Sequence, residues 1–261
     1  METFSLRKRI HDRSKPPLVI FPITLAHPAL VEIAGYAGAE AVLLDCEHGM
    51  MSPETIRDML SCASSSGTAA VFRPRSFDPV ACRQALDSGA AGVHVSHVDT
   101  ADEARAAVEA CRYAPVGCRE MSLGRAVHFK AENLKPYVAQ ANDDQLLTVM
   151  IESLAGVDNV EEIAAVPGLD VLHIGAADLS HAMGHVLEYD TAQFQDAVDR
   201  ILAAAEANNI VVGFPTDSPE LVAELTTRGM RYFEADTPDW LLREVYADRI
   251  AALDGVFAAL R

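Results

Sequence analysis

Cysteine is scarce in this sequence, and its arrangement excludes two kinds of structural support. The five cysteines are an odd number, no two stand in a CxxC spacing, and none follows Cys118. This pattern excludes an obvious zinc knuckle and argues against a disulfide framework. Cys46 lies within a polar motif, but a small buried residue is a simpler interpretation of it than a nucleophile.

Long apolar runs and excess positive charge are missing as well. No apolar stretch approaches the length that spans a bilayer, and the basic start of the chain is not followed by the apolar core of a signal peptide. Lysine and arginine number 21 against 38 aspartates and glutamates, a formal net charge of −17. The missing apolar segments lead us to expect a cytoplasmic protein. Nucleic acid and anionic membranes would repel such a charge, so we expect neither as a partner.

The regular pattern of the chain is a repeated alternation of strand and helix signals. Short apolar, β-branched runs predict eight strands, at 16–23, 40–45, 69–73, 91–96, 146–152, 170–175, 210–214 and 231–236. Amphipathic segments predict helices at 54–65, 101–111, 155–165, 191–208 and 218–228. Apolar strands that alternate with helices are typical of a parallel sheet covered by helices.

Eight such units favour an α/β protein of the (β/α)₈ (TIM) barrel type, with residues 1–261 as one domain. A doubly wound open sheet is the competitor, but no GxGxxG or P-loop fingerprint follows any predicted strand. The longest interval between predicted strands, residues 97–145, is rich in glycine, proline and polar residues at its centre. Long segments of this kind are often functional, so we expect this one to hang over the barrel mouth.

Ionisable residues fall at the ends of four predicted strands. They are Asp45, Glu47 and His48 after the second, Arg73 at the end of the third, Glu152 at the end of the fifth and Asp178 after the sixth. Barrel enzymes build their active sites from the carboxyl ends of the strands, which meet at one mouth. These side chains therefore predict an active site.

The two later carboxylates are suited to a hard cation. Glu152 and Asp178 have no cysteine or histidine beside them in the sequence, so Mg²⁺ or Mn²⁺ fits better than a softer metal. The alternative is that each carboxylate caps a helix or joins an ion pair. The occurrence of both, on adjacent predicted strands, favours the metal site.

Arginine and histidine supply the other groups that catalysis needs. A guanidinium at Arg73 can bind a carboxylate or stabilise an enolate oxygen, although Arg75 is an alternative. His48 can act as a base near neutral pH if a carboxylate orients it, and Asp45 and Asp87 are the candidates. Among the other histidines, His173 is predicted to be a core residue, whereas spacing alone does not settle His94 and His97.

Several motifs, in this order, resemble those of the HpcH/HpaI aldolase family over nearly the whole chain. They are "LLDCEHG", "FRP", "ALDSGAAGVHVSHVDTADEAR", "CRYAPVGCR", "QAND", "MIES" and "IGAADLSHAMG". The resemblance implies a metal-dependent (class II) pyruvate aldolase, an aldehyde-lyase that cleaves 4-hydroxy-2-oxo acids into a 2-oxo acid and an aldehyde. It also implies a (β/α)₈ barrel.

The resemblance further implies a role for each matched residue. Glu152 and Asp178 would bind the divalent metal, which would be Mg²⁺ or Mn²⁺, with Co²⁺ and Zn²⁺ as further candidates. Arg73 would hold the pyruvate oxygens, and His48 paired with Asp87 would be the acid/base group. The backbone N–H groups of Gly175, Ala176, Ala177 and Asp178 would receive the pyruvate carboxylate, and Asp45 and Glu47 would line the site.

Assembly is implied by the same resemblance. Members of the family exchange a C-terminal helix between protomers and form hexamers built from dimers. The segment 238–261 has the amphipathic pattern that such a helix needs. We therefore expect a homo-oligomer, a hexamer arranged as a trimer of dimers.

Three positions depart from the family pattern. Glu120 replaces a glycine in the loop that would meet the second substrate, Met150 takes a position that is often glutamine, and "GAADLS" replaces "GPADLS". These changes leave the enolate-forming residues in place but affect the acceptor. A citrate-synthase-like or other carbon–carbon bond-forming synthase acting on oxaloacetate is therefore the alternative function, and a non-catalytic binding protein ranks last because no predicted site residue is lost.

Overall fold

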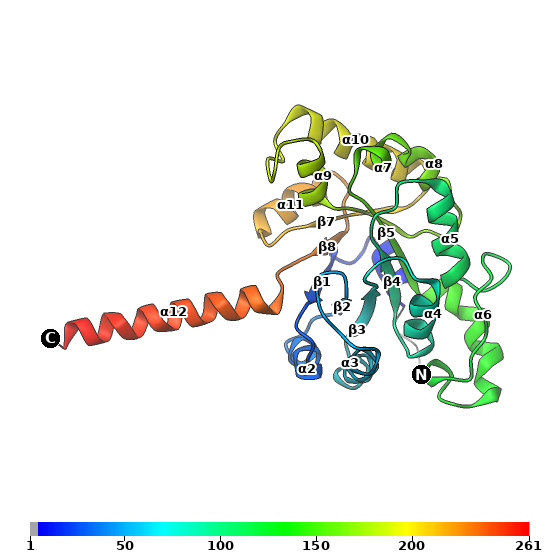
Figure 1. The fold of residues 1–261 in the computed structure, drawn as a ribbon, viewed down its shortest axis with the longest axis horizontal. Helices are drawn as coiled ribbons and strands as arrows, with labels where there is room; N and C mark the ends of the chain where they lie inside the picture. The colour runs from blue at the N-terminus through cyan, green and yellow to red at the C-terminus, as the bar shows by residue number, and fades with distance from the viewer. Residues whose placement is uncertain (1–4, 261) are drawn as a thin grey trace.

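Eight parallel strands close into a barrel in the order of the sequence (Figure 1). The computed structural model describes residues 5–260. The strands are β1 (Leu18–Ile23), β2 (Ala41–Asp45), β3 (Ala69–Arg73), β4 (Gly92–Val95), β5 (Leu146–Ile151), β6 (Val171–Ile174), β7 (Val211–Pro215) and β8 (Tyr232–Glu234). The predicted (β/α)₈ barrel is confirmed, and each predicted strand is found with its bounds shifted by at most two residues.

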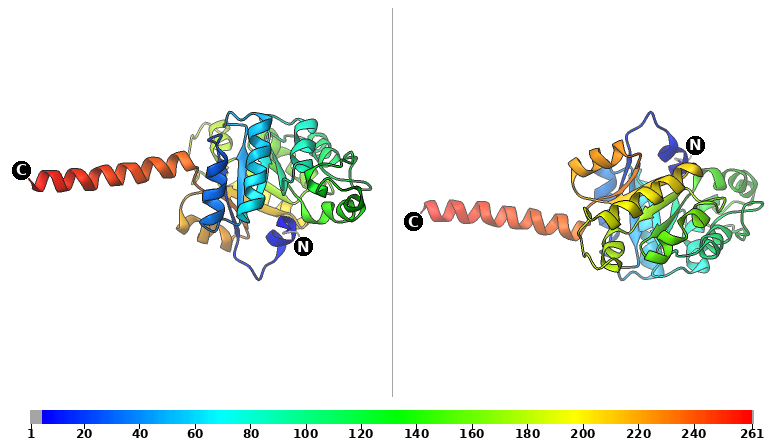
Figure 2. Two further views of the ribbon diagram at one scale, coloured as in Figure 1. Left: turned by 90° about the horizontal axis from the view of Figure 1, so that it is seen from below. Right: turned by 90° about the horizontal axis from the view of Figure 1, so that it is seen from above.

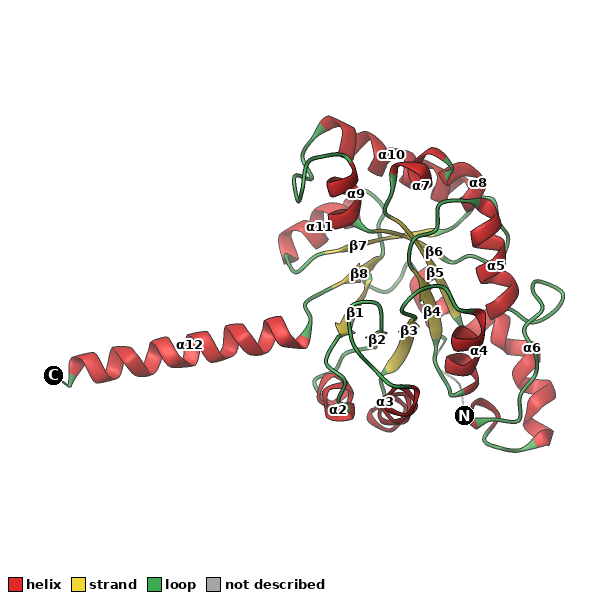
Figure 3. Ribbon diagram, in the orientation of Figure 1, coloured by secondary structure: helices red, strands yellow, loops and turns green. Residues whose placement is uncertain are grey.

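The helices lie on the outside of the barrel, except α12, which extends away from it (Figure 3). They are α1 (Leu6–His11), α2 (Pro28–Tyr36), α3 (Pro53–Ser66), α4 (Pro79–Asp87), α5 (Ala101–Cys111), α6 (Leu134–Asp144), α7 (Leu154–Asp158), α8 (Val160–Ala164), α9 (Ala176–Ala182), α10 (Ala192–Ala207), α11 (Pro219–Thr227) and α12 (Pro238–Ala259). Two 3₁₀ turns, η1 (Arg125–Val127) and η2 (Ala131–Asn133), precede α6. The helix predicted at 155–165 is divided at Asn159 into α7 and α8.

Side-chain caps explain where several helices begin. Ser52 accepts a hydrogen bond from Thr55 N ahead of α3, and Pro53 takes the first helical position, where a missing N–H costs nothing. Before α5, Thr100 and Glu103 form a complete capping box. Each of these helices therefore starts directly after the loop at the carboxyl end of a strand and fixes the end of that loop.

The side chains inside the barrel change from apolar to polar along the barrel axis. Its lower part, toward the amino-terminal ends of the strands, is packed mainly with apolar side chains, namely Leu6, Ile10, Leu18, Ile20, Ala41, Leu43, Val71, Leu146, Val171, Val211 and Tyr232. Its upper part holds buried polar side chains, namely Asp45, Arg73, His94, Thr148, His173 and Glu234. The polar residues thus occupy the end where a barrel binds its ligands.

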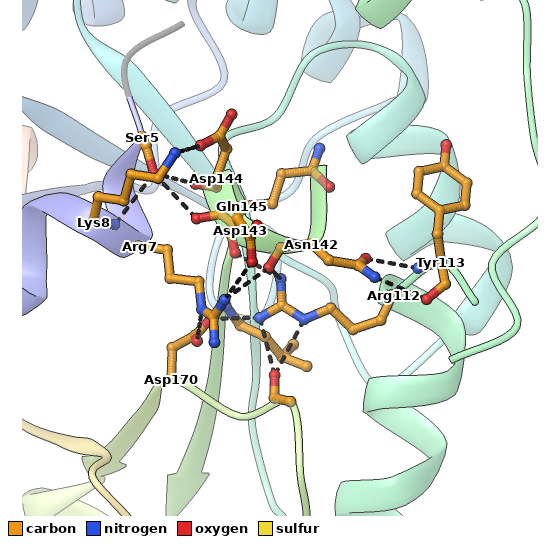
Figure 4. A network of polar contacts seen from close by, with 12 residues as sticks. Ser5, Arg7, Lys8, Arg112, Tyr113, Asn142, Asp143, Asp144, Gln145 and Asp170 are labelled. Carbon is orange, nitrogen blue, oxygen red and sulfur yellow. Dashed lines mark hydrogen bonds and ion pairs between the residues drawn. The ribbon is translucent and has the colours of Figure 1, made fainter. Parts of the chain in front are cut away.

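The long segment between α5 and β5 lies at the lower end of the barrel, so its predicted place over the mouth was wrong. Arg112 donates to the carbonyl oxygens of Gly168 and Gln145, which lie directly before β6 and β5. The reason is topological, because a helix that follows a strand returns the chain to the amino-terminal ends of the strands. Figure 4 shows this region, where Arg7 and Lys8 of α1 also bind the end of α6.

The C-terminal helix α12 extends away from the barrel (Figure 2). The predicted helix at 238–261 is confirmed for Pro238–Ala259, and residue 261 lies outside the described residues. Exchange of this helix between protomers stays a prediction. Among the helices of residues 5–260, none is both long and apolar enough to cross a membrane.

Candidate active site

Asp45 shapes the loop that follows β2. Its carboxylate is buried and accepts hydrogen bonds from the backbone N–H groups of Glu47 (2.9 Å) and His48 (3.2 Å). These bonds turn the chain beyond the strand and fix the backbone of Glu47 and His48 at the mouth. Glu47 stays partly buried, whereas His48 is exposed.

The same carboxylate binds Arg73 at the end of the neighbouring strand. Arg73 Nε and Nη2 donate to the two Asp45 oxygens at 2.9 and 2.7 Å, and β2 and β3 place the residues opposite each other. Burial alone would lower the pKa of Arg73, but the hydrogen bond to Asp45 and the charges of Glu234 and Glu47 raise it above its ordinary value. The guanidinium is therefore permanently charged and rigidly held.

Three further side chains meet at the mouth between β2, β4 and β5. Glu47, His97 and Glu152 each offer one ligand atom, and these atoms lie within 4.8 Å of one another. His97 Nδ1 is 3.1 Å from Glu152 Oε1, and His97 Nε2 is 3.5 Å from Glu47 Oε1. The backbone N–H of His97 also donates to Glu152 (2.7 Å), and Ser96 Oγ donates to Glu47 (2.6 Å).

Electrostatics at Glu152 favour the binding of a cation. Burial raises the pKa of this carboxyl, His97 partly opposes that shift, and the nearby charges of Glu47 and Asp178 raise the pKa further. A divalent cation would reverse this repulsion, because it favours the ionised carboxylate. Carboxylate oxygens and one imidazole nitrogen are ligands that such a cation accepts, so the residues fit the predicted metal.

The residues predicted after β6 are only partly free to bind a ligand. The N–H of Gly175 donates to Ile151 O (3.0 Å) and is therefore already used between β5 and β6, and the predicted binding of a carboxylate at Gly175 stays a prediction. A Cβ atom at Gly175 would lie 2.5 Å from Glu152 Cβ, which explains why glycine stands there. Ala176 and Ala177 begin α9, and Asp178 is exposed in its first turn.

Asp87 lies at the other end of the barrel from His48. It is the last residue of α4 and accepts a hydrogen bond from Arg119 (2.6 Å), whereas His48 follows β2 at the mouth. The acidic group beside the imidazole of His48 is Glu47, whose Oε2 is 3.8 Å from His48 Nε2. Within one chain, therefore, the structure does not bring together the predicted pair of His48 and Asp87.

The loop that carries Glu120 is also remote from the mouth of its own barrel. Glu120 is exposed and forms an ion pair with Arg83 of α4 (2.7 Å). Met150, the second departure, is buried at the carboxyl end of β5. Ala176, the third, begins α9 directly after Gly175, which packs against Glu152. In one chain, Met150 and Ala176 are therefore the departures that lie near the cluster around Glu152.

Sequence reasoning assigned no role to two residues of the site, His97 and Glu234. His97 comes two residues after β4, and the rule that places functional side chains at strand ends could have selected it. Its backbone adopts a left-handed conformation (φ 54°), which no motif indicated. Glu234 ends β8 by the same rule, and its buried position follows only from the closed barrel.

An eight-stranded barrel with an ionic cluster at the carboxyl ends of its strands is the architecture of a barrel enzyme. The chain belongs to the HpcH/HpaI aldolase/citrate lyase family, whose sequence profile matches residues 19–230. It is 33% identical over 258 residues to a 4-hydroxy-2-oxovalerate aldolase of Novosphingobium aromaticivorans, with 94% of this chain and 95% of that protein covered. Its relatives identify it as an enzyme of the carbon–carbon lyase class.

Solved structures agree with this fold. An HpcH/HpaI aldolase from Desulfitobacterium hafniense DCB-2 superimposes with a TM-score of 0.88 at 24% identity, covering 96% of this chain and 97% of that one. Macrophomate synthase superimposes with a TM-score of 0.86 at 25% identity, covering all of this chain and 93% of that one.

Proposed function

We propose that this chain is a divalent-metal-dependent aldolase that cleaves or forms 4-hydroxy-2-oxo acids through a pyruvate enolate. The observation that carries the proposal is the juxtaposition of the cluster of Glu47, His97 and Glu152 with a fixed arginine at the same mouth. The 4-hydroxy-2-oxovalerate aldolase that is similar over most of its length supports it.

Glu152 and Asp178 would hold the cation, with Glu47 and His97 beside them. Mg²⁺ and Mn²⁺ suit the carboxylate oxygens, and His97 keeps Co²⁺ and Zn²⁺ as candidates because imidazole binds those metals well. When bound, the cation supplies the Lewis acidity that polarises the 2-oxo group. The charges of Glu152, Glu47 and Asp178 at one mouth are the main physical reason to expect it there.

Arg73 would bind the pyruvate oxygens and stabilise the enolate. Asp45 uses Nε and one N–H of Nη2, and Nη1 has no hydrogen-bond partner among residues 5–260. The remaining N–H groups can therefore donate to an oxygen on which negative charge develops. The first turn of α9, at Ala176 and Ala177, would contribute backbone N–H groups to the pyruvate carboxylate.

His48 would transfer the proton of the C4 hydroxyl group. Its imidazole is exposed at the mouth, where a substrate can reach it. Asp87 could orient this imidazole only from a second protomer, because the two residues lie at opposite ends of one barrel. We expect His48→Ala to slow proton transfer far more than it weakens metal binding, and an unchanged rate would remove His48 from the mechanism.

Assembly into a hexamer, as a trimer of dimers with exchanged C-terminal helices, is part of the proposal. Helix α12 exposes a series of large apolar side chains that a partner could cover, namely Trp240, Leu241, Leu242, Val245, Tyr246, Ile250, Leu253, Val256 and Phe257. Exposed apolar surface of this extent is typical of interfaces. Light scattering coupled to gel filtration measures the mass directly, and a monomer would contradict this part.

The first experiment is exchange of the pyruvate methyl protons in D₂O, measured by mass spectrometry of recovered pyruvate. EDTA-treated protein should exchange no faster than protein-free solution, and added Mg²⁺ or Mn²⁺ should restore exchange. Glu152→Gln should abolish it, whereas the exposed Glu161→Gln, on the outer helix α8, should not. Full exchange in EDTA would refute the metal requirement.

A synthase that acts on oxaloacetate is the second candidate. The resemblance in structure to macrophomate synthase favours testing it. Absence of pyruvate exchange with every metal, together with consumption of oxaloacetate and an acyl-CoA, would select this function over the aldolase.

A further inference from the structure

A layer of ionisable side chains lies inside the barrel beneath the proposed active site. His94, His173 and Glu234 come from the alternate strands β4, β6 and β8, and all three are buried. Side chains from alternate strands form one layer of a barrel interior, and such layers usually consist of bulky apolar residues. Three ionisable groups in one layer therefore need an explanation, and the steps proposed above do not use them.

Glu234 is the centre of this layer. Its Oε1 is 2.9 Å from His94 Nδ1 and 3.8 Å from His173 Nε2. The two imidazole rings pack edge to face, with their centroids 5.1 Å apart. Among residues 5–260, neither nitrogen of His94, nor His173 Nδ1, nor Glu234 Oε1 forms a hydrogen bond of good geometry, so close charge–dipole contacts with Glu234 are the polar contacts of both rings.

A glycine on the neighbouring strand β7 leaves space for the imidazole of His173. A Cβ atom at position 213 on β7 would lie 2.6 Å from His173 Nδ1, so Gly213 is required for the imidazole to fit. Tyr232 lies two residues before Glu234 on β8, and its ring packs edge to face on His173 with centroids 5.7 Å apart. The imidazole is thus held on two sides.

Glu234 reaches across the barrel to the arginine of the site. Strands β8 and β3 are not neighbours in the closed sheet, yet Glu234 Oε2 is 3.8 Å from Arg73 Nη1. Asp45 holds the other edge of the same guanidinium through Nε and Nη2. Glu47 Oε2 also lies 3.5 Å from Nε, on the side of the guanidinium that Asp45 binds. Glu234 is therefore the carboxylate that approaches Nη1.

The charges of the layer are consistent with an ion pair. Burial would raise the pKa of Glu234, but His173, His94 and Arg73 outweigh burial and hold that pKa well below its usual range. Burial lowers the pKa of His173 to about 3, so this imidazole is neutral. An isolated buried carboxylate would cost several kcal/mol, so its pairing with Arg73 is what allows it to remain ionised there.

We propose that Glu234 is a positioning residue for Arg73. Held between His94 and His173, its carboxylate fixes Nη1 of the guanidinium from inside the barrel. The remaining N–H groups of Arg73 are then presented to a ligand at the mouth. This inference rests on the proposed function only in assigning Arg73 to the enolate.

The test replaces Glu234 by an uncharged side chain of the same shape. Glu234→Gln should lower the rate of metal-dependent pyruvate exchange roughly 10- to 100-fold, because small displacements of a catalytic group have effects of this size. Glu40→Gln is the matched control, since Glu40 also pairs with an arginine, Arg9, but at the opposite end of the barrel. It should leave the rate unchanged.

A double-mutant cycle separates positioning from a merely structural role. In an Arg73→Lys background, Glu234→Gln should change the rate less than about twofold, because the group on which it acts is gone. An equal loss in both backgrounds, or an unchanged rate in the single variant, would overturn the proposal. His94→Gln, which removes one support of Glu234, should give a smaller loss in the same direction and serves if Glu234→Gln does not fold.

Crystal structures of the wild-type protein and of Glu234→Gln test the same proposal without a measurement of activity. In Glu234→Gln we expect Arg73 to move away from the positions that bind Asp45 at 2.9 and 2.7 Å. Unchanged positions would overturn the proposal. If the wild-type protein exchanges pyruvate protons with no metal, the proposed function fails, whereas these structures still decide the role of Glu234.

Discussion

Two buried arginines, one at each end of the barrel, each pair with a buried aspartate but differ in how many of their N–H groups donate hydrogen bonds. Arg112 at the lower end is 2% exposed and pairs with Asp170, and Arg73 at the mouth is 6% exposed and pairs with Asp45. All three nitrogens of Arg112 donate hydrogen bonds, to Asp170 and to the carbonyl oxygens of Asn142, Gln145 and Gly168 (Figure 4). Among residues 5–260, Arg73 donates only to Asp45.

The difference separates a structural arginine from a functional one. A fully bonded guanidinium has nothing left for a ligand, so Arg112 ties together the segments before β5 and β6. A charged guanidinium with free N–H groups in a buried place is poised to bind an anion. Burial and the presence of a partner carboxylate do not distinguish the two; the number of unused donors does.

The largest expected effect is loss of the cation at the mouth. Glu152→Gln, Asp178→Asn or EDTA treatment should abolish metal-dependent turnover while circular dichroism shows the fold unchanged. Asp143→Asn, an exposed partner of Arg7 at the lower end, is the control and should keep its rate. Turnover that survives both carboxylate substitutions would contradict the predicted metal site.

Arg73→Lys should have the next largest effect. Loss of one donor to a developing negative charge costs about 10²- to 10³-fold in rate, and lysine cannot reproduce the planar fork. Metal binding, followed by calorimetry, should be retained. A loss of metal binding equal to the loss of rate would show that Arg73 supports the cation and not the enolate.

Arg112→Met should act on stability instead. Breaking a buried ion pair and leaving Asp170 without this partner costs about 3–5 kcal/mol in the free energy of unfolding. The rate per folded molecule should stay the same. Denaturant unfolding measures the change, with Arg200→Met as the control, because the pair of Arg200 and Glu161 is exposed and should contribute little to stability.

The remaining effect, small per pH unit, is a pH dependence of stability that comes from the upper part of the barrel interior. Burial lowers the pKa of His173 from 6.5 to about 3 in the folded protein. Below pH 6.5 the unfolded chain takes up a proton that the folded protein does not, so this contribution is complete above pH 6.5 and is lost as the pH falls toward 3. The free energy of unfolding should therefore fall by up to about 1.4 kcal/mol per pH unit.

Comparison with His173→Gln isolates this contribution, because glutamine does not titrate. Its unfolding free energy should vary less with pH than that of the wild-type protein over the same range. His185→Gln, on an exposed histidine, should behave like the wild-type protein. An equal slope in all three proteins would show that His173 does not remain neutral in the fold.

The periodicity of the apolar residues and the spacing of the predicted strands were sufficient to predict the barrel, because each strand is a short apolar run bounded by a helix signal. They also placed Asp45, Glu47, Arg73 and Glu152 at one mouth, since the carboxyl ends of parallel strands converge. They could not show that Gly175 N–H is used within the sheet, or that Asp87 lies at the opposite end. The contact between Arg73 and Glu234 crosses a closed barrel, and nothing local in the sequence records it.

The short helix α1 has a consequence for how the chain folds. It contains six residues, too few for a stable helix in water, and its anchors are distant: Arg7 binds Asp170, 163 residues away, and Arg231 binds Ile10 O, 221 residues away. It can become ordered only after β6 and β8 are in place. In native-state hydrogen exchange, its amides should be among the first to open, while the strands above them remain closed.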